Sequence, residues 1–213
     1  MSARQTQAWL GQIRATVAPR PQLQLDPGRC ALLVIDMLRY FADPGGRCYL
    51  PAGEAIIPRI AALLEAWRDR QATVVFTQHA HEGEEDLGML GRFFSDYIRA
   101  GEAQGEIVAA LAPRPGEPVI RKTTYDAFWQ TSLQEILAAR GCGQILVTGV
   151  LTHMCCETTA RSAFCRGLEV YVAADGTASS TEALHLSSLH AMADAVAIVL
   201  GIDEILGRCG RRG

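Results

Sequence analysis

Apolar runs alternate with helical patterns along most of this chain. Residues 30–36 (CALLVID) are apolar up to the closing aspartate, which is typical of a strand covered on both faces. Similar runs predict five more strands, over 72–78, 118–122, 144–150, 168–175 and 195–199. Apolar residues at helical spacing predict helices over 54–70, 126–140, about 154–166 and from about 180. This alternation predicts a three-layer α/β/α domain with a six-stranded parallel sheet and Rossmann-like topology.

The N-terminal segment has a different pattern. Trp9, Ile13 and Val17 fall on one face of a short amphipathic helix, and three prolines then interrupt residues 18–29. We therefore expect an arm over residues 1–27 that packs on the domain or on a partner subunit. The folded domain is expected over residues 28–206, and the Gly- and Arg-rich residues 207–213 are expected to form a flexible tail.

Composition narrows the class of protein. A chain of 213 residues with 49% hydrophobic and 20% charged residues suits one globular domain. Its formal net charge of −3 predicts no electrostatic attraction to nucleic acid or anionic membranes. No apolar run is long enough to span a bilayer and no signal-peptide pattern is present, so we expect a cytoplasmic protein. The seven cysteines form no regular framework and are interpreted as reduced thiols.

The ends of the expected strands indicate where chemistry can occur. Ligands of open parallel sheets bind in the crevice beyond the carboxyl ends of the strands. The polar residues at those ends are Asp36, Gln78, His79, Lys122, Thr152 and Asp175, and the thiols Cys155 and Cys156 begin the helix after the fourth strand. Taken singly, Asp36 also suits a turn cap, Lys122 a solvated surface position, and Cys155 a small buried hydrophobe.

Lys122 is the only lysine among 20 Lys and Arg residues. Together with Asp36 and Cys155 it suits an activated thiol, because a nearby ammonium and a helix N-terminus favour the thiolate and a carboxylate can take the proton. A compact ammonium can donate to both partners, whereas guanidinium is a wide planar fork. We therefore expect the thiol pKa of Cys155 to be lowered.

Three segments, in order, resemble the isochorismatase-like cysteine hydrolase superfamily, which includes nicotinamidases, N-carbamoylsarcosine amidases and isochorismatases. They are ALLVIDMLRYF, VIRKTTYDAF and VTGVLTHMCCETTARSAFCRGLEVYVAADGTAS. The resemblance covers about residues 28 to 200. It implies a homo-oligomeric enzyme, dimer or tetramer, that acts on a small molecule. No G-x-G-x-x-G turn follows the first strand, so no dinucleotide cofactor is expected. The resemblance implies no other cofactor.

By position, the resemblance makes Asp36 the general base, Lys122 the polarising cation and Cys155 the nucleophile of an acyl transfer through a thioester. The backbone N–H groups of Leu151 and Cys155 would form the oxyanion hole. A cis peptide before the family's threonine would here join Val150 and Leu151. The implied reaction is hydrolysis of an amide, carbamoyl or related C–N bond.

Departures from the family pattern leave alternatives open. Nicotinamidases begin a metal site with Asp-x-His, but here His79 stands where that Asp would be and His81 matches the first metal histidine. No third ligand is evident, so we expect no metal. Isochorismatases, which cleave a vinyl ether without a thiol, commonly carry Gly in place of Cys155. An ether hydrolase and a catalytically silent oligomeric module are therefore the alternatives. The roles of Cys156 and His153 are not fixed by the pattern.

The substrate itself cannot be identified from the sequence. Apolar and polar side chains near the expected crevice are candidate pocket residues, namely Tyr40, Phe41, His79, Tyr125, Trp129 and Thr152. Residues 82–94, acidic and then apolar, are a candidate loop over the site.

Overall fold

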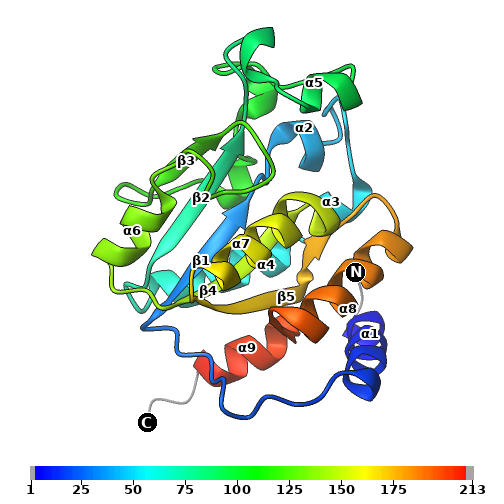
Figure 1. Ribbon diagram of the computed structural model, residues 1–213, viewed down its shortest axis with the longest axis vertical. Helices are drawn as coiled ribbons and strands as arrows, with labels where there is room; N and C mark the ends of the chain where they lie inside the picture. Colours follow the sequence, from blue (N-terminus) through cyan, green and yellow to red (C-terminus); the bar gives the residue numbers. More distant parts are fainter. Residues whose placement is uncertain (1–2, 210–213) are drawn as a thin grey trace.

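The computed structural model describes residues 3–209 and contains one six-stranded parallel sheet (Figure 1). The strand order is β3-β2-β1-β4-β5-β6. The strands span Cys30–Ile35 (β1), Val74–His79 (β2), Val119–Lys122 (β3), Gln144–Val150 (β4), Glu169–Ala178 (β5) and Ile198–Leu200 (β6). Each expected strand is present, and the predicted fold class is confirmed.

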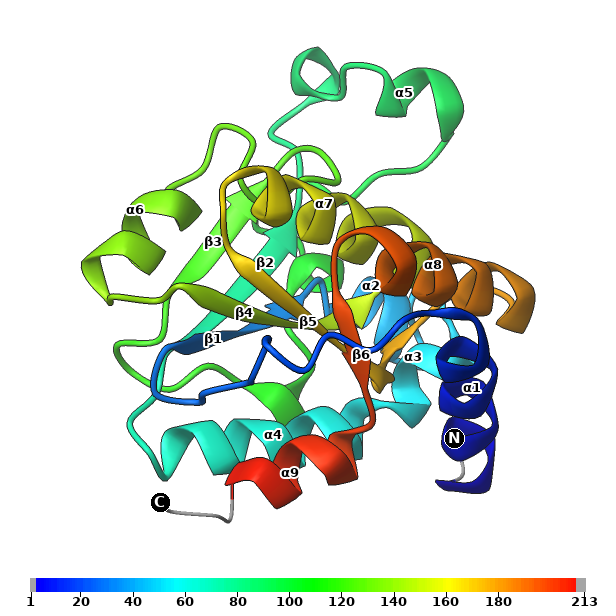
Figure 2. The same cartoon turned by 60° about the horizontal axis from the view of Figure 1, so that its bottom comes forward.

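Helices cover both faces of the sheet and enclose two apolar cores (Figure 2). On one face lie α6 (Leu133–Ala139), α7 (Glu157–Cys165) and α8 (Glu182–Ala195), and on the other lie α4 (Ile57–Arg68) and α9 (Ile202–Cys209). The strands are buried between these layers, with every residue of β1 and β4 buried. This explains why their sequences are apolar throughout rather than alternating.

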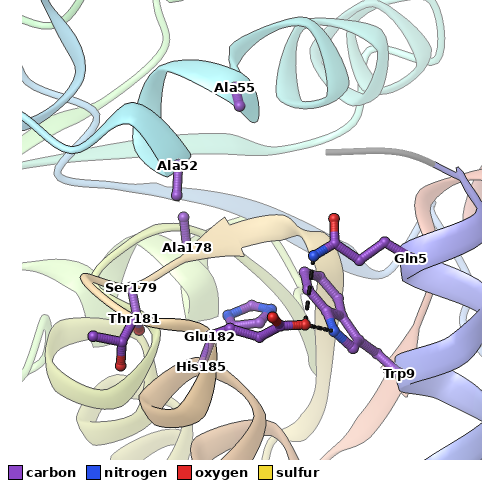
Figure 3. Close-up of a pocket in the computed structure, with 9 residues that line it drawn as sticks. All are labelled: Gln5, Trp9, Ala52, Ala55, Ala178, Ser179, Thr181, Glu182 and His185. Carbon is purple, nitrogen blue, oxygen red and sulfur yellow. Dashed lines mark hydrogen bonds between the residues drawn. The ribbon is translucent and has the colours of Figure 1, made fainter.

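The N-terminal arm docks on its own domain. Helix α1 (Ala3–Thr16) lies beside α8, with Trp9 and Ile13 buried. The indole Nε1 of Trp9 donates to Glu182 at 2.7 Å, and Arg14 pairs with Glu204 at 2.7 Å. A cavity of about 190 Å³ remains between α1, the start of α8 and α3 (Pro51–Ala55), as Figure 3 shows. Oligomerisation stays a prediction.

Three expected helices are shorter or divided. The pattern over 54–70 splits into α3 and α4, with Ile56 between them and a proline in the first turn of α4. Residues 126–132 form turns rather than the start of a helix, because Asp126 accepts from the N–H of Phe128 at 2.8 Å and from Ser162 at 2.7 Å. A π-helical turn, Thr152–Cys156, precedes α7.

The C-terminal boundary also differs from expectation. Helix α9 extends to Cys209, so residues 207–209 belong to it, and the remainder of the expected tail, 210–213, lies outside the described residues. The remaining short elements are α2 (Arg39–Ala42), α5 (Leu90–Phe93) and 3-10 turns at Glu84–Asp86, Ala103–Gly105 and Ala109–Leu111. Within residues 3–209, no helix is both long and apolar enough to cross a bilayer.

The strand order places the site. Chain connections from β1 and β4, which are neighbours in the sheet, lead to opposite faces, and this leaves a crevice beyond their carboxyl ends. Gly149 in β4 has φ of 109°, and a Cβ there would overlap the carbonyl oxygen of Ile35 in β1. Glycine therefore permits the close approach that brings the two strand ends together.

Candidate active site

Asp36 stands directly after β1 and is fully buried. Its backbone has φ of 49°, an uncommon conformation for a residue other than glycine. The hydroxyl of Thr77, in β2, donates to Asp36 Oδ1 at 2.7 Å and accepts from the Asp36 N–H at 3.1 Å. These two bonds fix the carboxylate, so that its second oxygen, Oδ2, faces the end of β3.

Lys122 ends β3 and is 1% exposed. Its Nζ lies 2.7 Å from Asp36 Oδ2 and 3.3 Å from Cys155 Sγ. It also lies 2.9 Å from the carbonyl oxygen of Thr124 and 3.3 Å from Nδ1 of His79, its neighbour across the β2–β3 pairing. The ammonium is therefore held at the centre of four acceptors, which satisfies a charge that would otherwise be costly to bury.

Cys155 lies in the π-helical turn that follows β4 and runs directly into α7. The peptide between Val150 and Leu151 is cis, as the resemblance implied. Cys155 is 8% exposed, and its sulfur lies within 4.8 Å of ligand atoms of both Asp36 and His79. The neighbouring Cys156 is fully buried with its Sγ near the carbonyl of Thr148, and all seven cysteines are unpaired.

The pKa values of Asp36, Lys122 and Cys155 are shifted by burial and by their mutual charges, and the shift of Cys155 differs from the expected one. Burial, the largest influence, would raise the pKa of Asp36, but Lys122, His79 and Thr77 together bring it below its ordinary value. Burial likewise opposes the charge of Lys122, yet Asp36 and Cys155 raise its pKa to about 12. Asp36 and Lys122 therefore form an ion pair over a wide pH range.

The expected lowering of the thiol pKa is wrong for the free protein. Burial raises the pKa of Cys155 to about 12; Lys122 lowers it, but Asp36 raises it again. The resting thiol therefore keeps its proton. Asp36 Oδ2 pairs with Lys122 at 2.7 Å and, as a carboxylate oxygen, keeps a further lone pair that can accept that proton.

The geometry does not suit a metal at this position. Asp36, His79 and Cys155 bring three potential ligand atoms together, but the Lys122 ammonium contacts all three residues and already supplies the positive charge. The Nε2 atoms of His79 and His81 lie 3.1 Å apart in a single hydrogen bond, in which one donates and the other accepts, so neither directs a free lone pair at an ion.

A cavity of about 380 Å³ opens over Asp36 and Cys155. Its walls are mostly apolar and aromatic, and come from the ends of β1 and β2, the π-helical turn and the segment around α5. The lining residues include Tyr40, Phe41, His79, Tyr125, Leu151 and Met154, and, from the candidate loop, Leu87, Leu90, Gly91 and Phe94. Figure 1 shows α5 beyond the carboxyl ends of the strands, and Leu90 and Gly91 of α5 line the cavity.

Of the six candidate pocket residues, Tyr40, Phe41, His79 and Tyr125 line this cavity and the other two do not. Trp129 is 57% exposed and does not line the cavity; it lies in the turn over residues 127–130, where a helix was expected. Thr152 is buried behind the site, where its hydroxyl bonds Nδ1 of His185 at 2.8 Å. Of the other strand-end residues, Gln78 bonds the carbonyl of Gly105, and Asp175 pairs with Arg59.

Sequence reasoning missed two contributors. Thr77 is an interior residue of β2, and nothing in its pattern indicates a contact with Asp36. Thr124 acts through its backbone carbonyl, which leaves no trace in the sequence. His153, whose role was open, bonds Ser179 at 2.9 Å.

Comparisons with known proteins agree on one family. A family model described as the isochorismatase domain matches residues 30–204. Nicotinamidase 3 of Arabidopsis thaliana is 35% identical over 178 residues, which are 82% of this chain and 86% of that protein. A probable isochorismatase of Pseudomonas chlororaphis is 30% identical over 188 residues, or 87% and 88% of the two chains. The crystal structure of a cysteine hydrolase from Pseudomonas syringae pv. phaseolicola 1448A matches with a TM-score of 0.86 and 27% identity, covering 91% of this chain and 98% of that chain.

Proposed function

This chain belongs to the isochorismatase-domain family of hydrolases, and we propose that it is a cysteine-dependent hydrolase of small, uncharged amides, carbamoyl compounds or related C–N bonds. The observation that carries the proposal is the contact of one buried ammonium with both a thiol sulfur and a carboxylate oxygen. A thiol, a base and a cation in this arrangement are the components of nucleophilic acyl transfer.

The reaction begins with proton transfer from Cys155 Sγ to Asp36 Oδ2. The sulfur electron pair attacks the substrate carbon, and the carbonyl electrons move to the oxygen, which we assign to the N–H groups of Leu151 and Cys155. As the C–N bond breaks, Asp36 returns the proton to the departing nitrogen. Lys122 stabilises first the thiolate and then the carboxylate, because it touches both.

Hydrolysis of the thioester completes the cycle. Asp36, ionised again, takes a proton from water, whose oxygen attacks the acyl carbon. The C–S bond then breaks, and the thiol leaves with the proton held by Asp36. Dividing acyl transfer into two steps replaces one high barrier by two lower ones.

The cavity supports an uncharged substrate. Among its lining residues, all within the described part of the chain, there is no arginine or lysine. The one lining carboxylate other than Asp36 is Asp96, which already pairs with Arg47 at 2.9 Å and accepts from Tyr40 at 3.0 Å. Isochorismate carries two carboxylates, and burying them without a cation is costly. The lining therefore favours C–N hydrolysis over vinyl ether cleavage.

The test measures ammonia or amine release from a panel of small amides, carbamates and ureas. The wild type is compared with Cys155→Ala, and Cys156→Ala serves as the matched control, since it removes the adjacent buried thiol. We expect Cys155→Ala to lose more than about 1000-fold in rate while Cys156→Ala stays active. Isochorismate turnover that survives in Cys155→Ala would instead assign the protein to the ether hydrolases.

A further inference from the structure

Three side chains continue the hydrogen bonding of Lys122 away from Cys155. His79 Nδ1 lies 3.3 Å from Lys122 Nζ, and His79 Nε2 lies 3.1 Å from His81 Nε2. On the far side, His81 Nδ1 lies 3.0 Å from Asp86 Oδ1. His81 is 1% exposed and Asp86 belongs to the 3-10 turn after β2. The chain of hydrogen bonds therefore runs from the catalytic ammonium to the loop that covers the site.

The order of these contacts assigns every proton. An ammonium only donates, so Nδ1 of His79 accepts, and the neutral ring must carry its hydrogen on Nε2. That N–H donates to Nε2 of His81, which must then carry its own hydrogen on Nδ1 and donate it to the carboxylate of Asp86. The hydrogen bonds therefore all run in one direction, and we call this chain of bonds the relay. Lys122 donates to His79, His79 donates to His81, and His81 donates to Asp86.

The relay matters because Lys122 has more acceptors than protons. Its three N–H groups face four acceptors: Asp36 Oδ2, the Thr124 carbonyl, His79 Nδ1 and Cys155 Sγ. The first two contacts, at 2.7 and 2.9 Å, are short, whereas the last two are both 3.3 Å. One proton of the ammonium is consequently shared between His79 and Cys155.

We propose that His79, supported by His81 and Asp86, is a positioning residue that holds this third ammonium proton whenever Cys155 is a thiol or a thioester. This inference rests on the proposed function of Cys155 as the nucleophile. When Cys155 gives its proton to Asp36, the ammonium proton turns from His79 Nδ1 to the thiolate, and it returns when the thioester forms. No proton passes along the relay, and the buried ammonium keeps three partners throughout the cycle.

The surrounding charges are consistent with a neutral His79. Burial and then Lys122 bring its pKa down to about 3, against the opposing effect of Asp36. In the loop that covers the site, Asp86 also lies 3.6 Å from Arg121. Arg121 in turn pairs with Glu82 of the same loop at 3.0 Å.

Tyrosine side chains complete the surroundings. The ring of Tyr97 stands edge-on to His81 with centroids 6.0 Å apart. Tyr125 lines the same cavity, and burial raises its pKa, so it stays uncharged as well.

Two variants of His79 separate the relay from a purely structural role. Asparagine places an acceptor where Nδ1 stands, whereas His79→Leu fills a similar volume without one. In His79→Leu the third ammonium proton has only Cys155 Sγ to bond, so we expect at least about a tenfold higher thiolate fraction at fixed pH. The pH profile of Cys155 alkylation by iodoacetamide should move to lower pH, while that of His79→Asn stays within about threefold of wild type.

The proton assignment is tested in the resting wild type by ¹⁵N NMR of histidine. We expect His79 as the Nε2–H tautomer and His81 as the Nδ1–H tautomer, with signals assigned from His79→Asn and His81→Phe. An Nδ1–H tautomer at His79, or an unchanged alkylation profile in His79→Leu, would overturn the proposal. Neither measurement uses a substrate. The proposed role of His79 can therefore be refuted while amide hydrolysis is confirmed, and it can be confirmed while amide hydrolysis is refuted.

Discussion

Replacement of Lys122 by arginine preserves the charge and changes only its shape. Lys122 Nζ has acceptors at 2.7, 2.9, 3.3 and 3.3 Å, and the residue is 1% exposed. A guanidinium presents its donors in a plane and cannot direct them at acceptors that converge on one atom. It is also larger, and forcing extra atoms into a packed interior costs about 1–3 kcal/mol.

The loss of rate follows from the bonds that are displaced. Two of them, to Asp36 Oδ2 and to Cys155 Sγ, act on the reacting groups. Hydrogen bonds to charged groups contribute about 1.5–3 kcal/mol each, so together they correspond to about two to four orders of magnitude in rate. We expect kcat of Lys122→Arg to fall within that range while the protein remains folded.

The assay compares kcat, KM and thermal unfolding for wild type, Lys122→Arg and Lys122→Met. Lys122→Met leaves the buried Asp36 carboxylate without its counter-charge, which costs about 3–5 kcal/mol, so its Tm should fall further than that of Lys122→Arg. If Lys122→Arg retained kcat within about threefold of wild type, the ammonium geometry would not matter, and the assignment of Lys122 would be refuted.

Four other changes have defined outcomes. Thr77→Val removes the donor to Asp36 Oδ1, so the pKa of Asp36 should rise, the acid limb of kcat/KM should move to higher pH, and kcat should fall about tenfold. Gly149→Ala should lower Tm sharply or prevent soluble expression, whereas Gly207→Ala, in open space on α9, should not. Trp9→Phe keeps an aromatic side chain but loses the N–H that donates to the Glu182 carboxylate, and urea unfolding should report a loss of about 1.5–3 kcal/mol. Asp36→Asn should abolish hydrolysis but accelerate alkylation of Cys155, measured by peptide mass spectrometry.

The residues that sequence reasoning brought together share one property. Asp36 and Lys122 end apolar runs, and Cys155 follows closely after a third. In a parallel sheet the carboxyl ends of all strands lie at one edge, so polar residues at those positions converge whatever their distance along the chain. The same logic selected Gln78 and Asp175, which make structural contacts elsewhere, because strand ends define an edge but not the direction of a side chain.

Other features depend on contacts between segments that no local pattern describes. Residues 126–132 have a helix-compatible sequence, but Asp126 bonds Ser162 in α7, and the chain turns instead. The exposure of Trp129 follows from that turn. The partnership of His81 with Asp86 likewise requires the loop after β2 to fold back on itself, and this is a property of tertiary structure.

The thiol pKa was misjudged for an electrostatic reason. Seen from Cys155, the ammonium of Lys122 and the carboxylate of Asp36 form a nearly neutral pair, so burial decides and the thiol stays protonated. The nucleophile is then formed only as the proton moves to Asp36. Asp36→Asn removes the carboxylate and leaves the ammonium unopposed, so the thiolate fraction at pH 8 should rise by at least about tenfold.

Hydrolysis should respond to the same change in the opposite direction. Asp36→Asn has no group that can take the proton of Cys155 and return it to the departing nitrogen, so its rate should fall by more than about 1000-fold. A residue that merely stabilised the fold would move both readouts together, since a disordered site neither binds substrate nor holds an ammonium beside the sulfur. Alkylation and hydrolysis that fall in parallel in Asp36→Asn, with Cys156→Ala unchanged in both, would therefore contradict the role of Asp36 as the base for Cys155.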